Sequence, residues 1–210
     1  MPSEGRPATE VGPRVLTFGT PPGAPPGARR GAAPGAATAR LALLDRDGVL
    51  IVDHGHVSTR EQVEWIAGVP QAIRSLREAG YAVVIVTNQA GIAKGLYTEE
   101  QFVELMGWMA SELANQGAPI AAVYYCPHHP TEGRPPYLVD CPCRKPKPGM
   151  LLRALEDAGA APAESLMIGD KQTDMQAAQA ARVPGYLFPG GDLGELVRRL
   201  VARPSQPRGT

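Results

Sequence analysis

The chain has 210 residues, room for one ordinary domain, and 43% of them are hydrophobic, enough to build a core. Its 21 basic residues balance 21 acidic ones, which argues against a general nucleic-acid binder, since such proteins are normally basic. No apolar run approaches the roughly 20 residues that span a bilayer. We therefore expect a soluble, cytoplasmic, monomeric protein with no nucleic-acid or membrane partner.

The two ends of the chain differ in composition from its middle. Residues 1–39 are dense in Pro, Gly, Ala and Arg, and such a segment buries too little apolar surface to offset the entropy lost on ordering. We predict a disordered leader over these residues and a frayed tail over residues 203–210. One domain, residues 40–202, is expected between them.

Within this domain, short apolar runs alternate with helical patterns. The expected strands are residues 41–44, 81–86, 120–125, 165–169 and 185–188. The expected helices are residues 70–80, 98–115, 148–159 and 172–182, and a last one that Asp192 caps. This order predicts an α/β fold with a doubly wound, mainly parallel sheet. Only one helix fits between the first two strands, so no cap domain is expected.

Polar residues follow the predicted strands, at the edge where the carboxyl ends of parallel strands meet and ligands bind. Asp45 and Asp47 follow the first strand, Thr87 the second and Asp170 the fourth, while Lys145 precedes a helix. Paired acids rarely end an apolar strand for packing reasons, because carboxylates repel one another and resist burial. They indicate a divalent metal and a phosphoryl group.

These residue types fit phosphate ester hydrolysis. A carboxylate can attack phosphorus and form an aspartyl-phosphate, and Mg²⁺ can neutralise the repulsion between the two anions. The natural Mg²⁺ ligands are Asp45, Asp170 and the backbone oxygen of Asp47. Asp47 also suits a general acid and base, and Thr87 and Lys145 suit the phosphoryl oxygens.

Some of these residues also have a purely structural explanation. Asp170 can cap a helix, and Thr87 can bond to its own backbone. Such explanations must account for four coincidences at one edge of the sheet, which favours the functional interpretation.

A long loop before Lys145 contains all three cysteines of the chain. Its Cys-x-His and Cys-x-Cys halves have the spacing of a structural zinc site with four closed ligands. The predicted zinc loop is residues 126–143. The predicted ligands are Cys126, His128, Cys141 and Cys143, with His129 as a competing histidine and ordinary reduced cysteines as the alternative.

The catalytic motifs resemble those of a known superfamily. Asp45-x-Asp47-Gly-Val, Thr87-Asn88, Lys145 and Gly169-Asp170-x-x-x-Asp174 resemble, in order, the four motifs of the haloacid dehalogenase (HAD) superfamily of phosphatases. The resemblance implies Asp45 as nucleophile, Asp47 as acid and base, and Asp170 as Mg²⁺ ligand. Thr87 and Lys145 would bind the phosphoryl group. Asp174 is left between capping a helix and orienting Lys171.

Longer stretches narrow the resemblance. Residues 53–57, 87–93, 124–130 and 143–150 are similar to the heptose bisphosphate phosphatase family, which implies a phosphorylated sugar as substrate and removal of its 7-phosphate. Arg144 joins the catalytic set by this resemblance. The implied substrate contacts are Asp53, His54, Gly55, His56, Thr87, Asn88, Gln89, Ala90, Arg144, Lys145 and Lys171.

A bisphosphate needs cations for its second phosphate, and the planar fork of Arg144 and the amine of Lys171 are available for it. Two alternatives remain. One is a histidinol-phosphatase, which shares the motifs and the zinc loop. The other is an inactive, zinc-stabilised binding module, although both acids, the lysine and the metal aspartate are all present.

Overall fold

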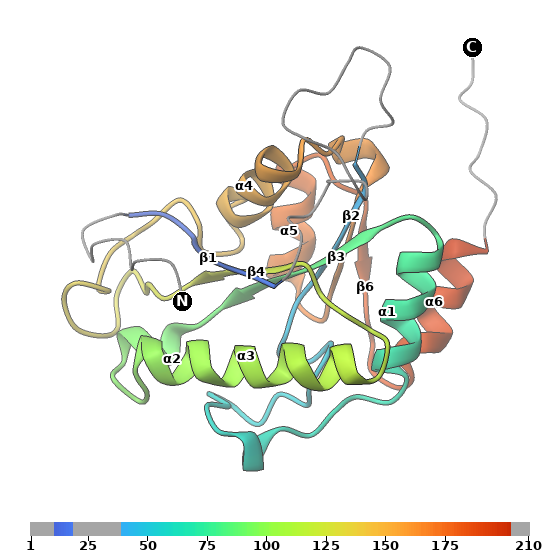
Figure 1. Cartoon of the computed structure of the whole chain (residues 1–210). Coiled ribbons are helices and arrows are strands. Elements are labelled where there is room, and N and C mark those ends of the chain that lie inside the picture. The colour runs from blue at the N-terminus through green and yellow to red at the C-terminus, as the bar shows by residue number, and fades with distance from the viewer. Residues whose placement is uncertain (1–10, 19–38, 203–210) are drawn as a thin grey trace.

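The computed structural model describes residues 11–18 and 39–202 (Figure 1). The predicted leader at residues 1–10 and 19–38, and the predicted tail at residues 203–210, lie outside the described residues. No helix in the described part is long and apolar enough to cross a membrane.

One six-stranded sheet forms the centre of the molecule, in the order β1-β4-β3-β2-β5-β6. Its strands are β1 (Arg14–Thr17), β2 (Leu41–Leu44), β3 (Ala82–Asn88), β4 (Ala122–Cys126), β5 (Leu166–Gly169) and β6 (Gly185–Leu187). The strands from β2 to β6 run parallel to their neighbours, and only β1 is antiparallel. The predicted α/β fold with a mainly parallel sheet is confirmed.

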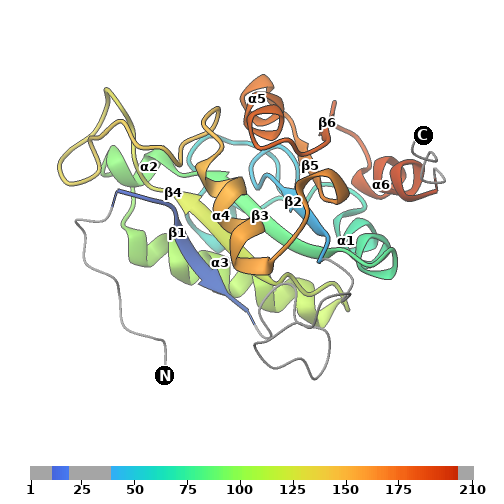
Figure 2. The same cartoon turned by 90° about the horizontal axis from the view of Figure 1, so that it is seen from above.

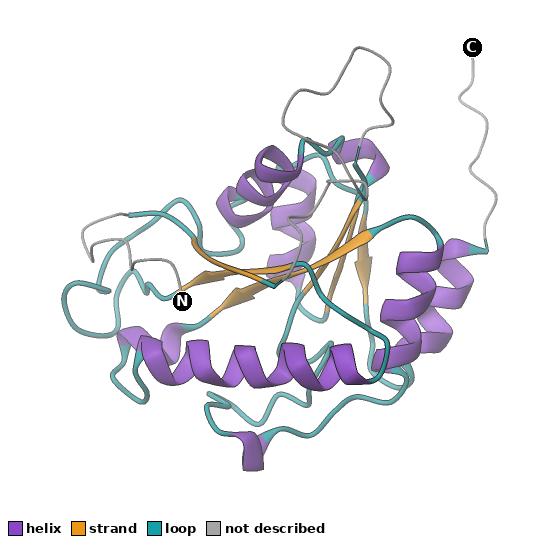
Figure 3. Ribbon diagram, viewed as in Figure 1, coloured by secondary structure: helices purple, strands orange, loops and turns teal. Residues whose placement is uncertain are grey.

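Helices cover both faces of this sheet (Figures 2 and 3). They are α1 (Val69–Glu78), α2 (Ala90–Ala93), α3 (Glu99–Asn115), α4 (Gly149–Ala158), α5 (Gln172–Ala180) and α6 (Leu193–Val201), with 3₁₀ turns at Arg60–Gln62 and Pro162–Glu164. Within the described residues, the segment between β2 and α1 contains one such turn and no separate cap domain.

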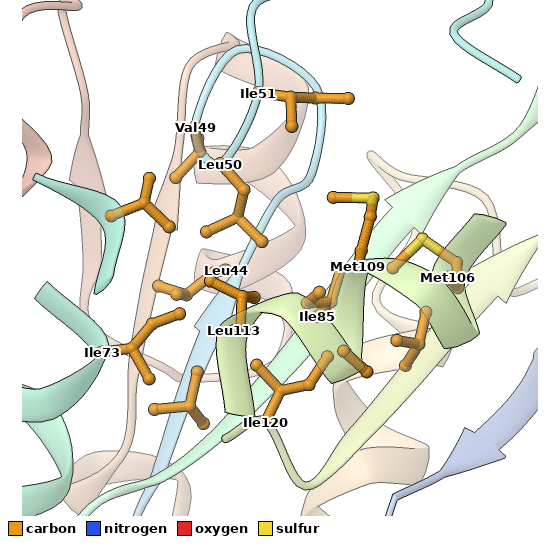
Figure 4. Packing of buried hydrophobic residues seen from close by; sticks show 14 of the residues in the cluster. Leu44, Val49, Leu50, Ile51, Ile73, Ile85, Met106, Met109, Leu113 and Ile120 are labelled. Atoms are coloured by element: carbon orange, nitrogen blue, oxygen red, sulfur yellow. The ribbon is translucent and has the colours of Figure 1, made fainter. Parts of the chain in front are cut away.

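The core consists of two apolar clusters, one on each face of the sheet. Successive side chains of a strand point to opposite faces, so Leu44 joins the cluster beneath α1, α3 and α6, while Leu43 joins the cluster beneath α4 and α5. Figure 4 shows the first cluster, in which Leu44 and Ile85 of the sheet lie near Ile73 and Leu113 of the helices. Burial on both faces explains why β2 is apolar at every position.

The ends of the helices follow the local signals in the sequence. Thr98 and Gln101 form the predicted capping box, in which each side chain accepts a hydrogen bond from the other residue's backbone N–H. Asp192 caps α6 by accepting from the backbone of Glu195. Gly159 ends α4 with φ +59°, a left-handed conformation that glycine adopts without strain.

The prediction of a disordered leader is wrong at residues 14–17, which form β1. This strand pairs antiparallel with β4 and supplies hydrogen-bond partners to an edge that would otherwise be exposed. Leu16 packs against one apolar cluster and Val15 against the other. The structured part of the domain therefore begins earlier than residue 40.

Candidate active site

The register of the sheet brings the ends of neighbouring strands to one edge. Leu44, the last residue of β2, lies opposite Ile85 of β3 and Ile168 of β5. The backbone N–H of Asp45 donates to the carbonyl of Ile168 at 2.9 Å. Asp45, after β2, and Asp170, after β5, therefore leave the sheet side by side.

Three carboxylates meet at this edge. An oxygen atom from each of Asp45, Asp170 and Asp174 lies within 4.8 Å of the others. The Nζ atom of Lys145 lies 2.9 Å from Asp45 Oδ2 and 2.6 Å from Asp174 Oδ1. The Lys171 ammonium lies farther off, 3.9 Å from Asp170 Oδ2. Two ammonium groups thus face three carboxylates, so the site keeps an excess of negative charge that suits a divalent cation.

Lys145 comes from the loop before α4 and is held in place over a long sequence distance. Its backbone N–H donates to Asn88 Oδ1, and its carbonyl accepts from Asn88 Nδ2, both at 3.0 Å. Its ammonium also donates to the carbonyl of Val86 at 2.9 Å. Asn88, at the end of β3, therefore fixes the lysine beside the acids, and this role explains the asparagine of the Thr-Asn motif.

Burial and charge shift the pKa values of this group. Burial raises the pKa of Asp45 to about 7, although Lys145 opposes the shift. Burial also raises the pKa of Asp170. Burial alone would lower the pKa of Lys145, but the charges of Asp45 and Asp174 outweigh it, and the pKa is raised. The raised pKa values mean that, without a bound cation, the ionised forms of Asp45 and Asp170 are less stable here than they are in water.

The two acids that the sequence predicts as side-chain ligands of Mg²⁺ fit a cation. Asp170 Oδ1 is buried and has no hydrogen-bond partner among the described residues, whereas buried carboxylate oxygens normally have one. Asp45 Oδ1 accepts from the backbone of Arg46, and Asp45 Oδ2 pairs with Lys145. The predicted backbone contact from Asp47 stays a prediction.

Asp174 uses both of its oxygens within the protein. Oδ2 accepts from the backbone N–H of Lys171 at 3.0 Å, which caps α5, and Oδ1 pairs with Lys145. Its carboxylate therefore caps the helix and also holds Lys145, a contact that the sequence did not indicate. Its contact with Lys171 is to the backbone, while the side chain of Lys171 pairs with Asp53 at 2.8 Å.

Asp47 faces a different set of partners from Asp45. The guanidinium of Arg46, which is only 1% exposed, holds its carboxylate through two nitrogens at 2.8–3.2 Å. Gln89 Nε2 donates to Asp47 Oδ2 at 3.1 Å and to Thr87 Oγ1 at 2.8 Å. Since Thr87 Oγ1 accepts this bond, its own proton remains available for a phosphoryl oxygen.

A cavity of about 410 Å³ opens over these groups. Its lining includes both acids of the first motif and most of the predicted substrate contacts. Those predicted residues are Asp45, Asp47, Asp53, Gly55, His56, Asn88, Gln89, Ala90, Arg144, Lys145 and Lys171. Thr87, Asp170 and His54 are not among the lining residues, and the Nε2 atom of His54 lies 2.9 Å from Glu64 Oε2.

Other residues line the cavity that the sequence did not assign to it. They are Arg46, Lys94, Tyr97, His129, Thr173 and Asp174. Lys94 adds one more cation to Arg144 and Lys171, the two predicted for the second phosphate, and it pairs with Glu132 of the zinc loop at 2.7 Å. Its position four residues after the Asn-Gln-Ala turn was the available signal, but only the tertiary structure brings it to the cavity.

The predicted zinc ligands form a buried cluster. One ligand atom from each of Cys126, His128, Cys141 and Cys143 lies within 4.8 Å of the others. The Nδ1 atom of His128 lies 3.8 Å from Cys126 Sγ and 3.7 Å from Cys143 Sγ. Hydrogen bonds from Cys126 and Cys143 lower the pKa of Cys141, whereas bonds with Cys126 and Cys141 raise that of Cys143. Four convergent sulfur and nitrogen donors fit a closed, tetrahedral zinc site.

The choice between the two neighbouring histidines follows from the structure. His128 is 2% exposed and faces the sulfurs. His129 instead lines the cavity, and its Nδ1 accepts from the backbone N–H of Glu132 at 2.9 Å. His128 is therefore the histidine of the cluster.

The cluster also fixes the loop that carries the cations. Arg144 Nη1 donates to the carbonyl of His128 at 3.2 Å. The backbone N–H of Arg134 donates to the carbonyl of Ala93 at 2.9 Å, which attaches the loop to α2. Folding of the loop around the four ligands therefore positions Arg144 and Lys145 over the acids.

Comparison with known proteins defines the class. Residues 42–134 match the family model of haloacid dehalogenase-like hydrolases, and residues 142–205 match the HAD-hydrolase-like model. With the acids at the carboxyl edge of a parallel sheet, these matches define a HAD-like hydrolase.

Relatives define the family within this class. A D-glycero-beta-D-manno-heptose-1,7-bisphosphate 7-phosphatase of Pasteurella multocida is 49% identical over 140 residues, which cover 67% of this chain and 76% of the relative's length. One of Rhodopseudomonas palustris is 42% identical over 160 residues, 76% of this chain and 89% of its own. The chain belongs to the heptose bisphosphate phosphatase family.

Solved structures agree with this assignment. A D,D-heptose 1,7-bisphosphate phosphatase from B. bronchiseptica, in complex with magnesium and phosphate, is 32% identical with a TM-score of 0.65, over 81% of this chain and 90% of its own. A HAD-like phosphatase from Mesorhizobium loti is 30% identical with a TM-score of 0.74, over 94% of this chain and 98% of its own.

Proposed function

We propose that the protein removes the 7-phosphate of D-glycero-β-D-manno-heptose 1,7-bisphosphate, in the biosynthesis of nucleotide-activated heptose. The observation that carries the proposal is one cavity that combines the paired acids with Arg144, Lys171 and Lys94, three cations in addition to Lys145 and Arg46 beside the acids. The relatives' names support the sugar and its β anomer. The histidinol-phosphatase and binding-module alternatives gain no support from these relatives.

The chain's own residues account for the chemistry in two steps. The carboxylate of Asp45 attacks phosphorus, the bond to the sugar oxygen breaks, and Asp47 gives its proton to the leaving alkoxide. Asp47 then takes a proton from water, which attacks the aspartyl-phosphate. Inorganic phosphate leaves, and Asp45 is a free carboxylate again.

Thr87 and Lys145 bind the phosphoryl oxygens in this proposal. The hydroxyl proton of Thr87 is free to donate, and the Lys145 ammonium lies beside the nucleophile at 2.9 Å. Both donors are buried and held by neighbours, so they need little rearrangement as charge develops. Mg²⁺ held by Asp45, Asp170 and the backbone oxygen of Asp47 would neutralise the charge between the carboxylate and the phosphoryl group.

The second phosphate of the substrate needs its own cations. Arg144, Lys171 and Lys94 line the same cavity as the nucleophile, and Arg144 offers a planar fork to phosphate oxygens. Sugar contacts are assigned to Asp53, His56 and the turn after β3. Zinc held by the Cys/His cluster has a structural role. We further propose a monomer that works in the cytoplasm.

The proposal is tested by phosphate release from both anomers of heptose 1,7-bisphosphate and from histidinol phosphate, with Mg²⁺ present. Phosphorus NMR should show loss of the 7-phosphate and retention of the 1-phosphate, with the β anomer preferred. Asp45→Asn should abolish turnover and keep the fold, because an amide is not a nucleophile towards phosphorus. Robust release from histidinol phosphate without release from either anomer would overturn the substrate, and turnover by Asp45→Asn would overturn the nucleophile.

A further inference from the structure

A buried chain of hydrogen bonds connects Tyr97 to the active site. The Tyr97 hydroxyl donates to Gln89 Oε1 at 2.6 Å, and Gln89 Nε2 donates to both Asp47 and Thr87. Tyr97 is 6% exposed, Gln89 is 2% exposed and Thr87 is fully buried. The sequence predicts a substrate contact for Gln89. In the structure, its amide forms hydrogen bonds with three protein groups, Tyr97, Asp47 and Thr87.

The orientation of this amide matters because its two ends are chemically different. Its N–H donors suit the carboxylate of Asp47, whereas its carbonyl oxygen would repel an ionised carboxylate at the same distance. The Tyr97 hydroxyl is a donor to the carbonyl end and therefore favours the orientation that faces the N–H donors towards Asp47 and Thr87. Burial raises the pKa of Tyr97 to about 12, so the hydroxyl keeps its proton at neutral pH.

The backbone between Gln89 and Tyr97 is folded to allow this contact. The short helix α2 follows Gln89 directly, and the backbone N–H of Leu96 donates to the carbonyl of Gly91 at 2.9 Å, which turns the chain back. A Cβ atom at Gly91 would lie 2.2 Å from a ring carbon of Tyr97. The glycine therefore leaves the space that the tyrosine ring occupies.

We propose that Tyr97 is a positioning residue for the hydrolysis. Through Gln89 it holds the carboxyl group of Asp47 in place for proton transfer to the leaving oxygen, and it keeps the Thr87 proton directed at the phosphoryl group. This inference rests on the proposed roles of Asp47 and Thr87, and it does not depend on the identity of the sugar.

The test uses the dependence of the reaction on its leaving group. The alkoxide of heptose 1,7-bisphosphate needs a proton from Asp47, whereas the nitrophenolate of p-nitrophenyl phosphate leaves without one. The ratio kcat/KM reports the step that breaks this bond. Tyr97→Phe should lower kcat/KM about tenfold for the sugar phosphate and at most about threefold for the aryl phosphate, the size expected for a hydrogen bond acting through an intermediate group.

Two further variants identify the route of the effect. Gln89→Met keeps the length of the side chain and removes the hydrogen bonds at both ends of the amide. Adding Tyr97→Phe to this variant should therefore lower kcat/KM for the sugar phosphate by less than about twofold. Tyr124→Phe is the matched control, because it removes a buried tyrosine hydroxyl that bonds to Asp157 on α4, and it should leave both substrates unaffected. Thermal unfolding of each variant checks the fold.

Asp47→Asn separates this inference from the proposed function. This variant should lower kcat/KM for the sugar phosphate far more than kcat/KM for the aryl phosphate. Equal losses of kcat/KM would refute the acid role of Asp47 and, with it, the positioning role of Tyr97. If Asp47→Asn shows the difference but Tyr97→Phe lowers both substrates equally, or if its effect is undiminished in Gln89→Met, the positioning role of Tyr97 is refuted and the proposed function stands.

Discussion

Lys145 forms a buried ion pair with Asp45, its Nζ atom 2.9 Å from Oδ2, although the two residues are 100 positions apart in the sequence. The two side chains are 1% and 9% exposed, and the lysine also bonds to the backbone of β3. The nucleophile and the cation that faces it therefore form one unit, and its charge state links catalysis to stability.

Without Mg²⁺, this unit should make stability depend on pH. Burial raises the pKa of Asp45 from 3.8 to about 7, so the folded protein binds this proton more tightly than the unfolded chain does. The free energy of unfolding should then fall as pH rises from about 4 to about 7, by about 1–3 kcal/mol. Asp45→Asn lacks the titrating group and should lose less stability over this range.

Denaturant unfolding in EDTA, at several pH values, measures this difference. Plotted against pH, the free energy of unfolding should fall more steeply towards neutral pH for the wild type than for Asp45→Asn. Adding Mg²⁺ should restore the stability that the wild type loses. Parallel curves across the whole range would rule out a raised pKa at Asp45.

Gly48 should be required for the position of Asp170. A Cβ atom there would lie 2.2 Å from Asp170 Oδ2, so Gly48→Ala should displace the carboxylate and raise the Mg²⁺ concentration for half-maximal activity about tenfold. Gly95→Ala is the control, since its φ of +71° is also left-handed but its Cβ would meet nothing within 4 Å.

Both glycine variants should lose about 1 kcal/mol of stability from the positive φ, so only the Mg²⁺ dependence separates them. An equal Mg²⁺ requirement in the two variants would count against Asp170 as a ligand.

The two neighbouring histidines should behave differently towards zinc. His128→Gln should lose the metal, because this ring faces Cys126 and Cys143, whereas His129→Gln should keep about one zinc per chain. Cys141→Ser should also lose it. Elemental analysis gives the content, and a fall in Tm of about 5–10 °C should accompany loss of the metal. A stable wild-type protein without zinc would exclude the site.

Lys94 should contribute to binding of the second phosphate. Lys94→Gln should raise KM about tenfold for heptose 1,7-bisphosphate, since it removes one cation from the cavity, and it should leave KM nearly unchanged for heptose 7-phosphate. Lys147→Gln is the matched control, because Lys147 also pairs with an acid of the zinc loop, Asp140, but does not line the cavity.

Steady-state kinetics with the two substrates check this prediction. A similar rise of KM for both substrates in Lys94→Gln would show that the lysine does not recognise the second phosphate. A rise in Lys147→Gln as large as that in Lys94→Gln would assign the effect to the loop as a whole.

Local patterns in the sequence are sufficient to predict the class of the fold and the position of Asp45 and Asp170 at the edge of the sheet. A wholly apolar run such as residues 41–44 predicts a strand buried on both faces, and the Thr98 capping box and Asp192 mark helix starts because their bonds are made within a few residues. The residues that follow parallel strands lie at one edge of the sheet, so the sequence alone predicts that Asp45 and Asp170 lie close together.

Tertiary structure decided what depends on partners distant in sequence. The sequence placed residues 14–17 in a disordered leader, but the exposed edge of β4 pairs with them. It left His128 and His129 as competitors, and burial against the sulfurs selects His128. It predicts a substrate contact for Gln89, which lines the cavity, but it does not reveal that the buried amide bonds to Tyr97, Thr87 and Asp47. A side chain's type specifies the bonds it can make, but only the folded chain supplies the partners with which it makes them.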